Sequence, residues 1–122
     1  MYSIKLEAMQ AIIEAAKNTF PNEFIGMLGG NKKEKIIDEL IVVPATFGES
    51  HSSIYSHLVP FDPKIMGTVH SHPNESSHPS RKDLNAFAKL GEVHIIIAKP
   101  FDFFSAKCYS AKGKIARLKI IE

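Results

Sequence analysis

Two helices are predicted from apolar residues that recur at helical spacing. Within residues 5–20 the apolar residues stand three or four positions apart: Leu6, Met9, Ile13, Ala16 and Phe20. This spacing places them on one face, so we expect an amphipathic helix that packs against a core and ends before Pro21. A second helix is predicted from an N-cap at Ser80 to a stop at Gly91. Its buried face is expected to hold Leu84, Phe87 and Ala88.

Short apolar runs bounded by glycine, proline or polar residues predict strands. These runs cover residues 23–30, 35–44, 64–72, 92–100, 105–111 and 114–121. We expect the first strand to end in a glycine turn at Gly29 and Gly30, and Lys112 with Gly113 to join the last two strands as a hairpin. Residues 45–64 are predicted to be irregular. The order of elements predicts an α/β or α+β fold, in which helices pack on a mixed sheet.

Composition and charge indicate an ordinary globular protein. The 122 residues are expected to form one domain, 1–122, and 44% of them are hydrophobic while 23% are charged. A net charge of +2, from 15 basic and 13 acidic residues, is too small to indicate a nucleic-acid partner. Lys32, Lys33 and Lys35 cluster beside a predicted turn, where solvation explains them.

Neither membrane insertion nor an oxidising compartment is indicated. No apolar run approaches the ~20 residues that span a bilayer. The first residues, MYSIKLEAMQ, lack the apolar core of a signal peptide, so we expect a cytoplasmic protein without a membrane partner. Cys108 is the one cysteine, which excludes an internal disulfide and any cysteine-rich zinc site.

The stretch HSHPNESSHPSRKD, residues 70–83, brings metal-binding residue types to the end of a predicted strand. His70 and His72 stand two residues apart, so both side chains point to the same face of that strand. Asp83 falls in the first turn of the next helix, where its carboxylate can face the strand end. Two imidazoles and one carboxylate leave one tetrahedral position for water, which is typical of a catalytic zinc site.

A second interpretation of the same residues is helix capping. Ser80 at the N-cap and Asp83 at the third helical position form a weaker version of the capping box, which usually has Glu at that position. His70 and His72 alone would also be weak evidence, because surface strands carry such pairs by chance. The local pattern therefore leaves metal binding and capping open.

Taken together, the positions resemble the signature of the JAMM (MPN-plus) metalloproteases, H-x-H-P followed by S-x-x-D. Ser80 stands eight residues and Asp83 eleven residues after His72. The family also has a glutamate in a P-x-E-x-x-G segment that leads into a strand, and PNEFIGMLGG places Glu23 there. The resemblance covers most of the chain, and the small stand-alone prokaryotic and archaeal members fit best.

This resemblance implies a cytidine deaminase-like fold, a curved mixed sheet flanked by helices. It implies one zinc ion per chain, bound by His70, His72 and Asp83. Glu23 would take a proton from the attacking water and pass it to the leaving amine. Ser80 would donate a hydrogen bond to the oxyanion. The sequence leaves open whether Ser80 can do this while it caps the helix.

The activity implied is zinc-dependent cleavage after the C-terminal Gly-Gly of ubiquitin-like proteins or their conjugates. Ubiquitin-like sulfur carriers have the same tail, so their processing in a biosynthetic pathway is an alternative. A non-catalytic MPN scaffold is an alternative of another class, but such modules have usually lost zinc ligands. Nucleotide deamination would need a cysteine-bearing zinc motif, which is absent.

The expected substrate tail is thin and extended, because two glycines let the backbone pass close to the metal. Such a tail could bind by adding to an exposed strand edge. The segment that precedes the strand of His70 is shorter than it often is in the family, and insertions that hold a second ubiquitin have no room. We therefore expect weak discrimination among linkages. The oligomeric state is not indicated.

Other polar residues have competing interpretations. His78 could be a fourth ligand, a loop residue or a substrate contact. Glu75 is a rival general base, or a solvated loop carboxylate. His94 lies in an apolar strand and is expected to be a packed or edge histidine, and His51 and His57 have no recognisable partner spacing.

Overall fold

The computed structural model describes residues 1–43, 45–47, 52–54 and 62–122. Its helices are α1 (Leu6–Thr19), α2 (Arg81–Lys89) and the short 3-10 helix η2 (Phe103–Ser105). Its strands are β1 (Tyr2–Lys5), β2 (Ile25–Asn31), β3 (Ile36–Ile41), β4 (Ala45–Phe47), β5 (Ser52–Ile54), β6 (Ile65–His72), β7 (Val93–Ala98), β8 (Ala106–Ser110), β9 (Ile115–Ala116) and β10 (Leu118–Ile121).

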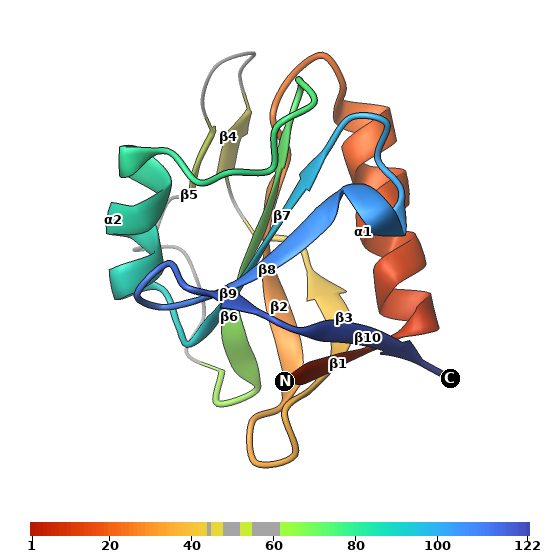
Figure 1. Ribbon diagram of the computed structural model, residues 1–122, viewed down its shortest axis with the longest axis vertical. Coiled ribbons are helices and arrows are strands. Elements are labelled where there is room, and N and C mark those ends of the chain that lie inside the picture. The colour runs from red at the N-terminus through yellow and green to blue at the C-terminus, as the bar shows by residue number, and fades with distance from the viewer. Residues whose placement is uncertain (44, 48–51, 55–61) are drawn as a thin grey trace.

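Within the described residues, eight strands form one mixed sheet and two form a separate antiparallel pair. The order in the large sheet is β10-β1-β3-β2-β6-β7-β8-β9, and the pair is β4-β5. Figure 1 shows a curved sheet with α1 on one side and α2 on the other. The first and last strands, β1 and β10, run parallel and side by side. The expected fold, a curved mixed sheet flanked by helices, is confirmed.

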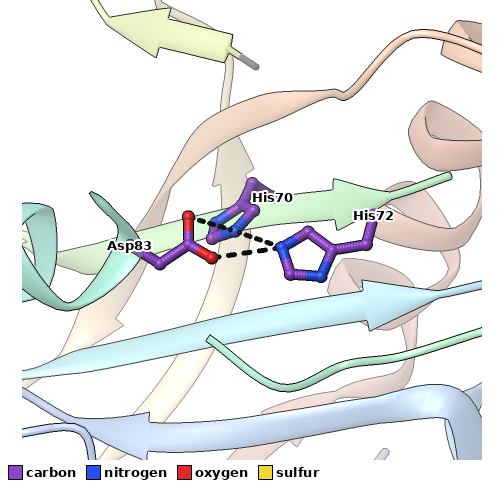
Figure 2. A group of neighbouring side chains, drawn as sticks. All are labelled: His70, His72 and Asp83. Atoms are coloured by element: carbon purple, nitrogen blue, oxygen red, sulfur yellow. Dashed lines mark hydrogen bonds and ion pairs between the residues drawn. The ribbon is translucent and has the colours of Figure 1, made fainter. Parts of the chain in front are cut away.

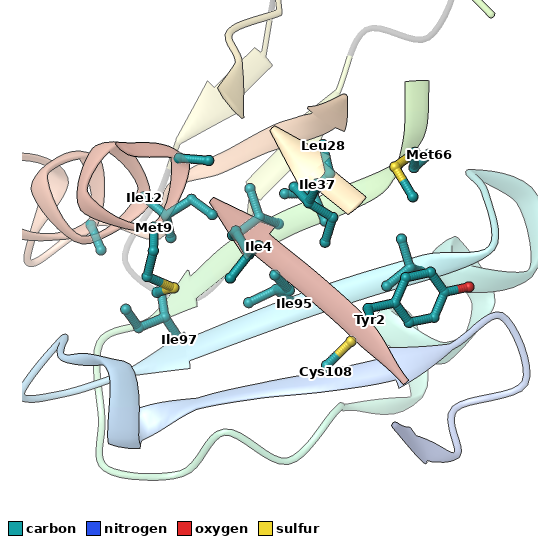
Figure 3. Close-up of a cluster of buried hydrophobic side chains, with 14 of the residues drawn as sticks. Tyr2, Ile4, Met9, Ile12, Leu28, Ile37, Met66, Ile95, Ile97 and Cys108 are labelled. Atoms are coloured by element: carbon teal, nitrogen blue, oxygen red, sulfur yellow. The ribbon is translucent and has the colours of Figure 1, made fainter. Parts of the chain in front are cut away.

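Helix α1 covers the face of the sheet that holds the main core. Its buried residues are Ala8, Met9, Ile12 and Ala16. They pack against apolar residues of the strands, among them Ile4, Leu28, Ile37, Ile95 and Ile97 (Figure 3). The predicted face was wrong at both ends, because Leu6 is 37% exposed and Phe20 is 40% exposed. The buried stripe runs through Ile12 instead.

Helix α2 lies on the opposite face and is attached to it through one buried residue, Phe87. Phe87 packs with Ile96 of β7 and Tyr109 of β8. The predicted burial of Leu84 and Ala88 was wrong, since both are exposed. Leu84 lies against Gly113 in the turn after β8, where an added Cβ would collide with it.

The pairing of the central strands brings three chain segments to one end of the sheet. β6 and β7 are parallel, with His72 opposite Ala98, and α2 connects them. β2 is antiparallel to β6, with Ile25 opposite His70. The residues that precede β2 therefore lie beside the carboxyl end of β6. In open α/β sheets, ligands bind outside the carboxyl ends of such strands.

Several predicted strand boundaries were wrong, because the pairing with neighbouring strands decides where each strand begins and ends. Gly29 and Gly30 lie within β2 at an irregularity of its ladder, and the turn comes later, at residues 32–35. The run 114–121 is split, because β9 pairs with β8 whereas β10 pairs with β1. The hairpin turn at Gly113 is confirmed, with its N–H donated to the Ser110 carbonyl at 2.9 Å.

The strand β1 was not predicted, and residues 45–64, predicted to be irregular, contain β4 and β5. Pro44, His51 and His57 lie outside the described residues. Among the residues that are described, no helix is long and apolar enough to cross a membrane.

Candidate metal centre

Three side chains from β6 and α2 converge on one point (Figure 2). The Nε2 atoms of His70 and His72 are 3.2 Å apart. Asp83 Oδ1 lies 3.1 Å from His70 Nε2, and Asp83 Oδ2 lies 3.2 Å from His72 Nε2. The three side chains are only 5%, 12% and 14% exposed. The same-face placement predicted for the two histidines is confirmed.

The geometry fits one zinc ion. Donors at ~2.0–2.1 Å from zinc form a tetrahedron whose edges are about 3.3 Å. The 3.2 Å between the two Nε2 atoms matches such an edge. Each of these nitrogens also has one Asp83 oxygen at 3.1–3.2 Å, Oδ1 beside His70 and Oδ2 beside His72. Two imidazole nitrogens and a carboxylate oxygen are a donor set that zinc prefers.

The tautomer of His72 is fixed by the loop that follows it. His72 Nδ1 lies 2.9 Å from the Ser76 carbonyl oxygen. A carbonyl can only accept, so Nδ1 carries the proton, and in the neutral ring the Nε2 lone pair points at the cluster. Burial alone would lower the pKa of His72, but the hydrogen bond with Asp83 outweighs it and raises the pKa above the usual value.

Asp83 is at once a cluster member and part of a capping box. The Ser80 side chain accepts from Asp83 N–H at 3.1 Å, and Asp83 Oδ2 accepts from Ser80 N–H at 2.8 Å. The capping interpretation is confirmed. Burial works to raise the pKa of Asp83, but hydrogen bonds from His70 and His72 hold it well below its usual range.

Glu23 reaches the cluster because of the way β2 is paired. Ser71, between the two histidines, faces the other way and accepts from Phe24 N–H at 2.8 Å, while its own N–H donates to the Phe24 carbonyl at 2.9 Å. These bonds continue the β2–β6 pairing one residue beyond Ile25. Glu23 then lies half-buried at the cavity beside the cluster. Burial raises its pKa, against the lowering effect of His70 and His72.

The cavity at this site has a volume of about 310 Å³. Its walls include Glu23, Thr68, His70, His72, Ser80 and Asp83. His78 also lines it, but is exposed and is not part of the described His/Asp cluster. Glu75 is exposed and does not line the cavity, so the geometry favours Glu23 as the base. His94 is fully buried, as a packed histidine was expected to be.

Three residues around the cluster were not predicted from the sequence to belong to the site. Ser71 fixes β2 against β6, and its position between the histidines is the signal that could have identified it. Thr68 lines the cavity, and its place two residues before His70 on the same face could have indicated this. The Ser76 carbonyl has no sequence signal, because any residue could supply it.

Comparison with known proteins identifies the family. Residues 5–109 match the model of prokaryotic homologues of the JAB domain. A probable metalloprotease of Haloferax volcanii is 30% identical over 128 aligned residues, which cover 98% of this chain and 79% of that protein.

Solved structures agree. One, described as a JAMM metalloprotease-like zinc site in the proteasome and signalosome, has 38% identity and a TM-score of 0.79, and the match covers 100% of this chain and 99% of that one. A JAB1/MPN domain protein from Archaeoglobus fulgidus has 38% identity and a TM-score of 0.78, with 100% of both chains covered. A cluster that fits zinc and this kinship disfavour a non-catalytic scaffold. The chain therefore belongs to the prokaryotic JAB branch of the JAMM (MPN) family and is a zinc metalloprotease.

Proposed function

We propose that this metalloprotease cleaves the peptide or isopeptide bond after the C-terminal Gly-Gly of ubiquitin-like modifier proteins. His70, His72 and Asp83 bind the zinc ion, while Glu23 and Ser80 act on the substrate. One observation carries the proposal: the half-buried Glu23 carboxylate lines the same cavity as the three converging ligand side chains. The relative described as a metalloprotease-like zinc site in the proteasome and signalosome supports it.

Glu23 is the group that moves the proton. A bound zinc ion lowers the pKa of water to ~7 and polarises a carbonyl. The Glu23 carboxylate takes a proton from the attacking water and delivers it to the nitrogen of the leaving amine. Burial raises its pKa above that of an ordinary glutamate, which brings its acid form closer to neutral pH.

Ser80 can cap the helix and also serve the reaction. Its Oγ accepts from Asp83 N–H, and this bond uses a lone pair of the hydroxyl. A hydroxyl has two lone pairs and one proton, so its O–H remains free to donate to the oxyanion of the substrate. One such donor can contribute ~3 kcal/mol to transition-state stabilisation.

The position of the site constrains how a tail can bind. β6 lies between β2 and β7, so a substrate tail cannot extend the sheet at β6 itself. The tail must cross the cavity at the carboxyl end of β6. The two glycines before the scissile bond carry no Cβ, so the backbone of the tail can pass close to the metal site. We therefore expect a tail ending in Gly-Gly to be required, with little dependence on the amine-bearing partner.

The experiment uses ubiquitin-like proteins fused through Gly-Gly to a reporter, with Gly-Val fusions as the matched control. We expect rapid cleavage after Gly-Gly and a sharp fall with Gly-Val. Glu23→Gln should retain zinc, measured by metal analysis, and lose about 100-fold or more in kcat. Glu75→Gln is the control and should cleave at the wild-type rate. Cleavage of unfolded protein at many sites, without preference for glycine, would contradict the proposal.

The sulfur-carrier alternative is separated by the same assay. Carriers and modifiers share the Gly-Gly tail but differ in their folded surfaces. If carrier fusions are cleaved at a kcat/KM far above that of modifier fusions, processing of carriers is the activity. Similar values for both would indicate that the tail alone is recognised.

A further inference from the structure

His94 is a fully buried polar side chain on the face of the sheet that carries the metal cluster. It stands opposite Thr68 in the parallel pairing of β6 and β7. Its Nδ1 lies 2.7 Å from the Thr68 hydroxyl and 3.3 Å from Thr68 N. Its Nε2 lies 3.1 Å from the Gly91 carbonyl oxygen. Since a carbonyl only accepts, Nε2 carries the proton and Nδ1 accepts from Thr68.

The two hydrogen-bonded partners of His94 belong to the two segments that carry the cluster. Thr68 precedes His70 by two residues on β6. Gly91 directly follows Leu90, the C-cap of α2, and the first turn of α2 carries Asp83. One imidazole thus connects the strand of the two histidines with the end of the helix that supplies the aspartate.

Phe87 adds a direct contact between His94 and α2. The rings of His94 and Phe87 are stacked, with centroids 4.3 Å apart and planes within 8°. Phe87 also lies 6.4 Å from the His70 ring, and it is the buried residue of α2, one turn after Asp83. A nine-residue helix is not stable alone. The place of α2 therefore depends on this contact and on its cap.

We propose that His94 is a positioning residue that sets the distance between Asp83 and the histidine pair for metal binding. It acts through Thr68, Gly91 and Phe87, and it does not line the cavity itself. The inference rests on the ligand set proposed above. Burial lowers the pKa of His94 to about 4, so the imidazole is neutral at pH 7, as this bonding pattern requires.

The test is the zinc affinity of the purified metal-free chain, measured by competition with a chelator of known affinity. His94→Gln can still donate to the Gly91 carbonyl, and His94→Asn can still accept from Thr68, but both lose the ring that stacks on Phe87. We expect each to bind zinc about tenfold more weakly, since residues that support metal ligands commonly have effects of this size. Unfolding in the presence of chelator reports stability separately.

A second substitution, made in a chain that already lacks Asp83, distinguishes a positioning role of His94 from a merely structural one. In an Asp83→Ala chain, the ligand that His94 positions is gone, so His94→Gln should change the remaining zinc affinity less than twofold. A tenfold loss in that background too would overturn the inference. So would variants that lose thermal stability but bind zinc as tightly as the wild type.

If both His94 variants fail to fold, Thr68→Val tests the positioning role instead. It removes the hydroxyl that donates to His94 and keeps the stacked rings of His94 and Phe87. We expect a few-fold loss of zinc affinity, and an unchanged affinity would overturn the inference. Substrate cleavage plays no part in these readouts. A failed Gly-Gly assay therefore refutes the proposed function alone, and unchanged affinities refute only the positioning role.

Discussion

Acidification should destabilise the metal-free protein through His94. The imidazole is neutral when folded, with a pKa of about 4 against an ordinary value of 6.5, because burial penalises its charged form. Between these values the unfolded chain binds a proton that the folded chain does not. His94 therefore leaves stability intact above pH 6.5 and reduces it as the pH falls, with the loss complete below pH 4.

The magnitude follows from the two pKa values. Their difference, at about 1.4 kcal/mol for each pH unit, corresponds to about 3 kcal/mol in all. Most of this, about 2–3 kcal/mol, should be lost between pH 7.5 and pH 4.5. For a domain of this size, that is a large part of the 5–15 kcal/mol typical of folded proteins.

The assay is urea unfolding of wild type and His94→Gln across this pH range, with chelator present to exclude metal. The comparison matters because His72, whose pKa is raised, titrates in the opposite direction in the same range. Asp83, whose pKa is lowered, destabilises only at more acidic pH, below its usual value of 3.8. The stability difference between the two proteins should shrink by about 2–3 kcal/mol on acidification. A difference that stays constant from pH 7.5 to pH 4.5 would refute a buried neutral His94.

Three further outcomes are expected. Ser80→Ala should lower the unfolding free energy by about 1 kcal/mol through loss of the cap, and should lower kcat more than it raises KM. Gly67→Ala should prevent folding, seen by circular dichroism, because a Cβ there would collide with the Val93 carbonyl oxygen; Gly29→Ala, which meets only side chains, should fold. Zinc binding should release more protons as the pH falls below neutral, because His72 must lose its proton, and calorimetry in two buffers measures this.

The cluster was predictable because its geometry is local. Residues two positions apart on a strand point to the same face of the sheet. For this reason the Nε2 atoms of His70 and His72 come to lie 3.2 Å apart. Asp83 was predictable because a helix start follows the strand end within a short loop. Glu23 needed the family pattern, since only the antiparallel pairing of β2 with β6 brings it near.

What the sequence did not reveal depends on distant partners. Tyr2–Lys5 becomes β1 because it pairs with β10, more than a hundred residues later, and with β3. The last apolar run is split where the Arg117 carbonyl accepts from Tyr2 N–H at 2.8 Å. Gly30 lies inside β2, paired with Ile37 of β3, and must be glycine there because a Cβ would collide with the Ile36 carbonyl oxygen. None of these contacts has a local pattern.

The two interpretations of Ser80 and Asp83, capping and metal binding, turn out to describe one arrangement. A carboxylate offers about four lone pairs. Asp83 Oδ2 already accepts from Ser80 N–H while facing His72 Nε2, and Oδ1 faces His70 Nε2. The capping box thus holds the carboxylate rotamer that the metal needs, in a helix whose buried residue is Phe87. A substitution that weakens the cap should therefore weaken zinc binding too, even where it leaves all three ligands in place.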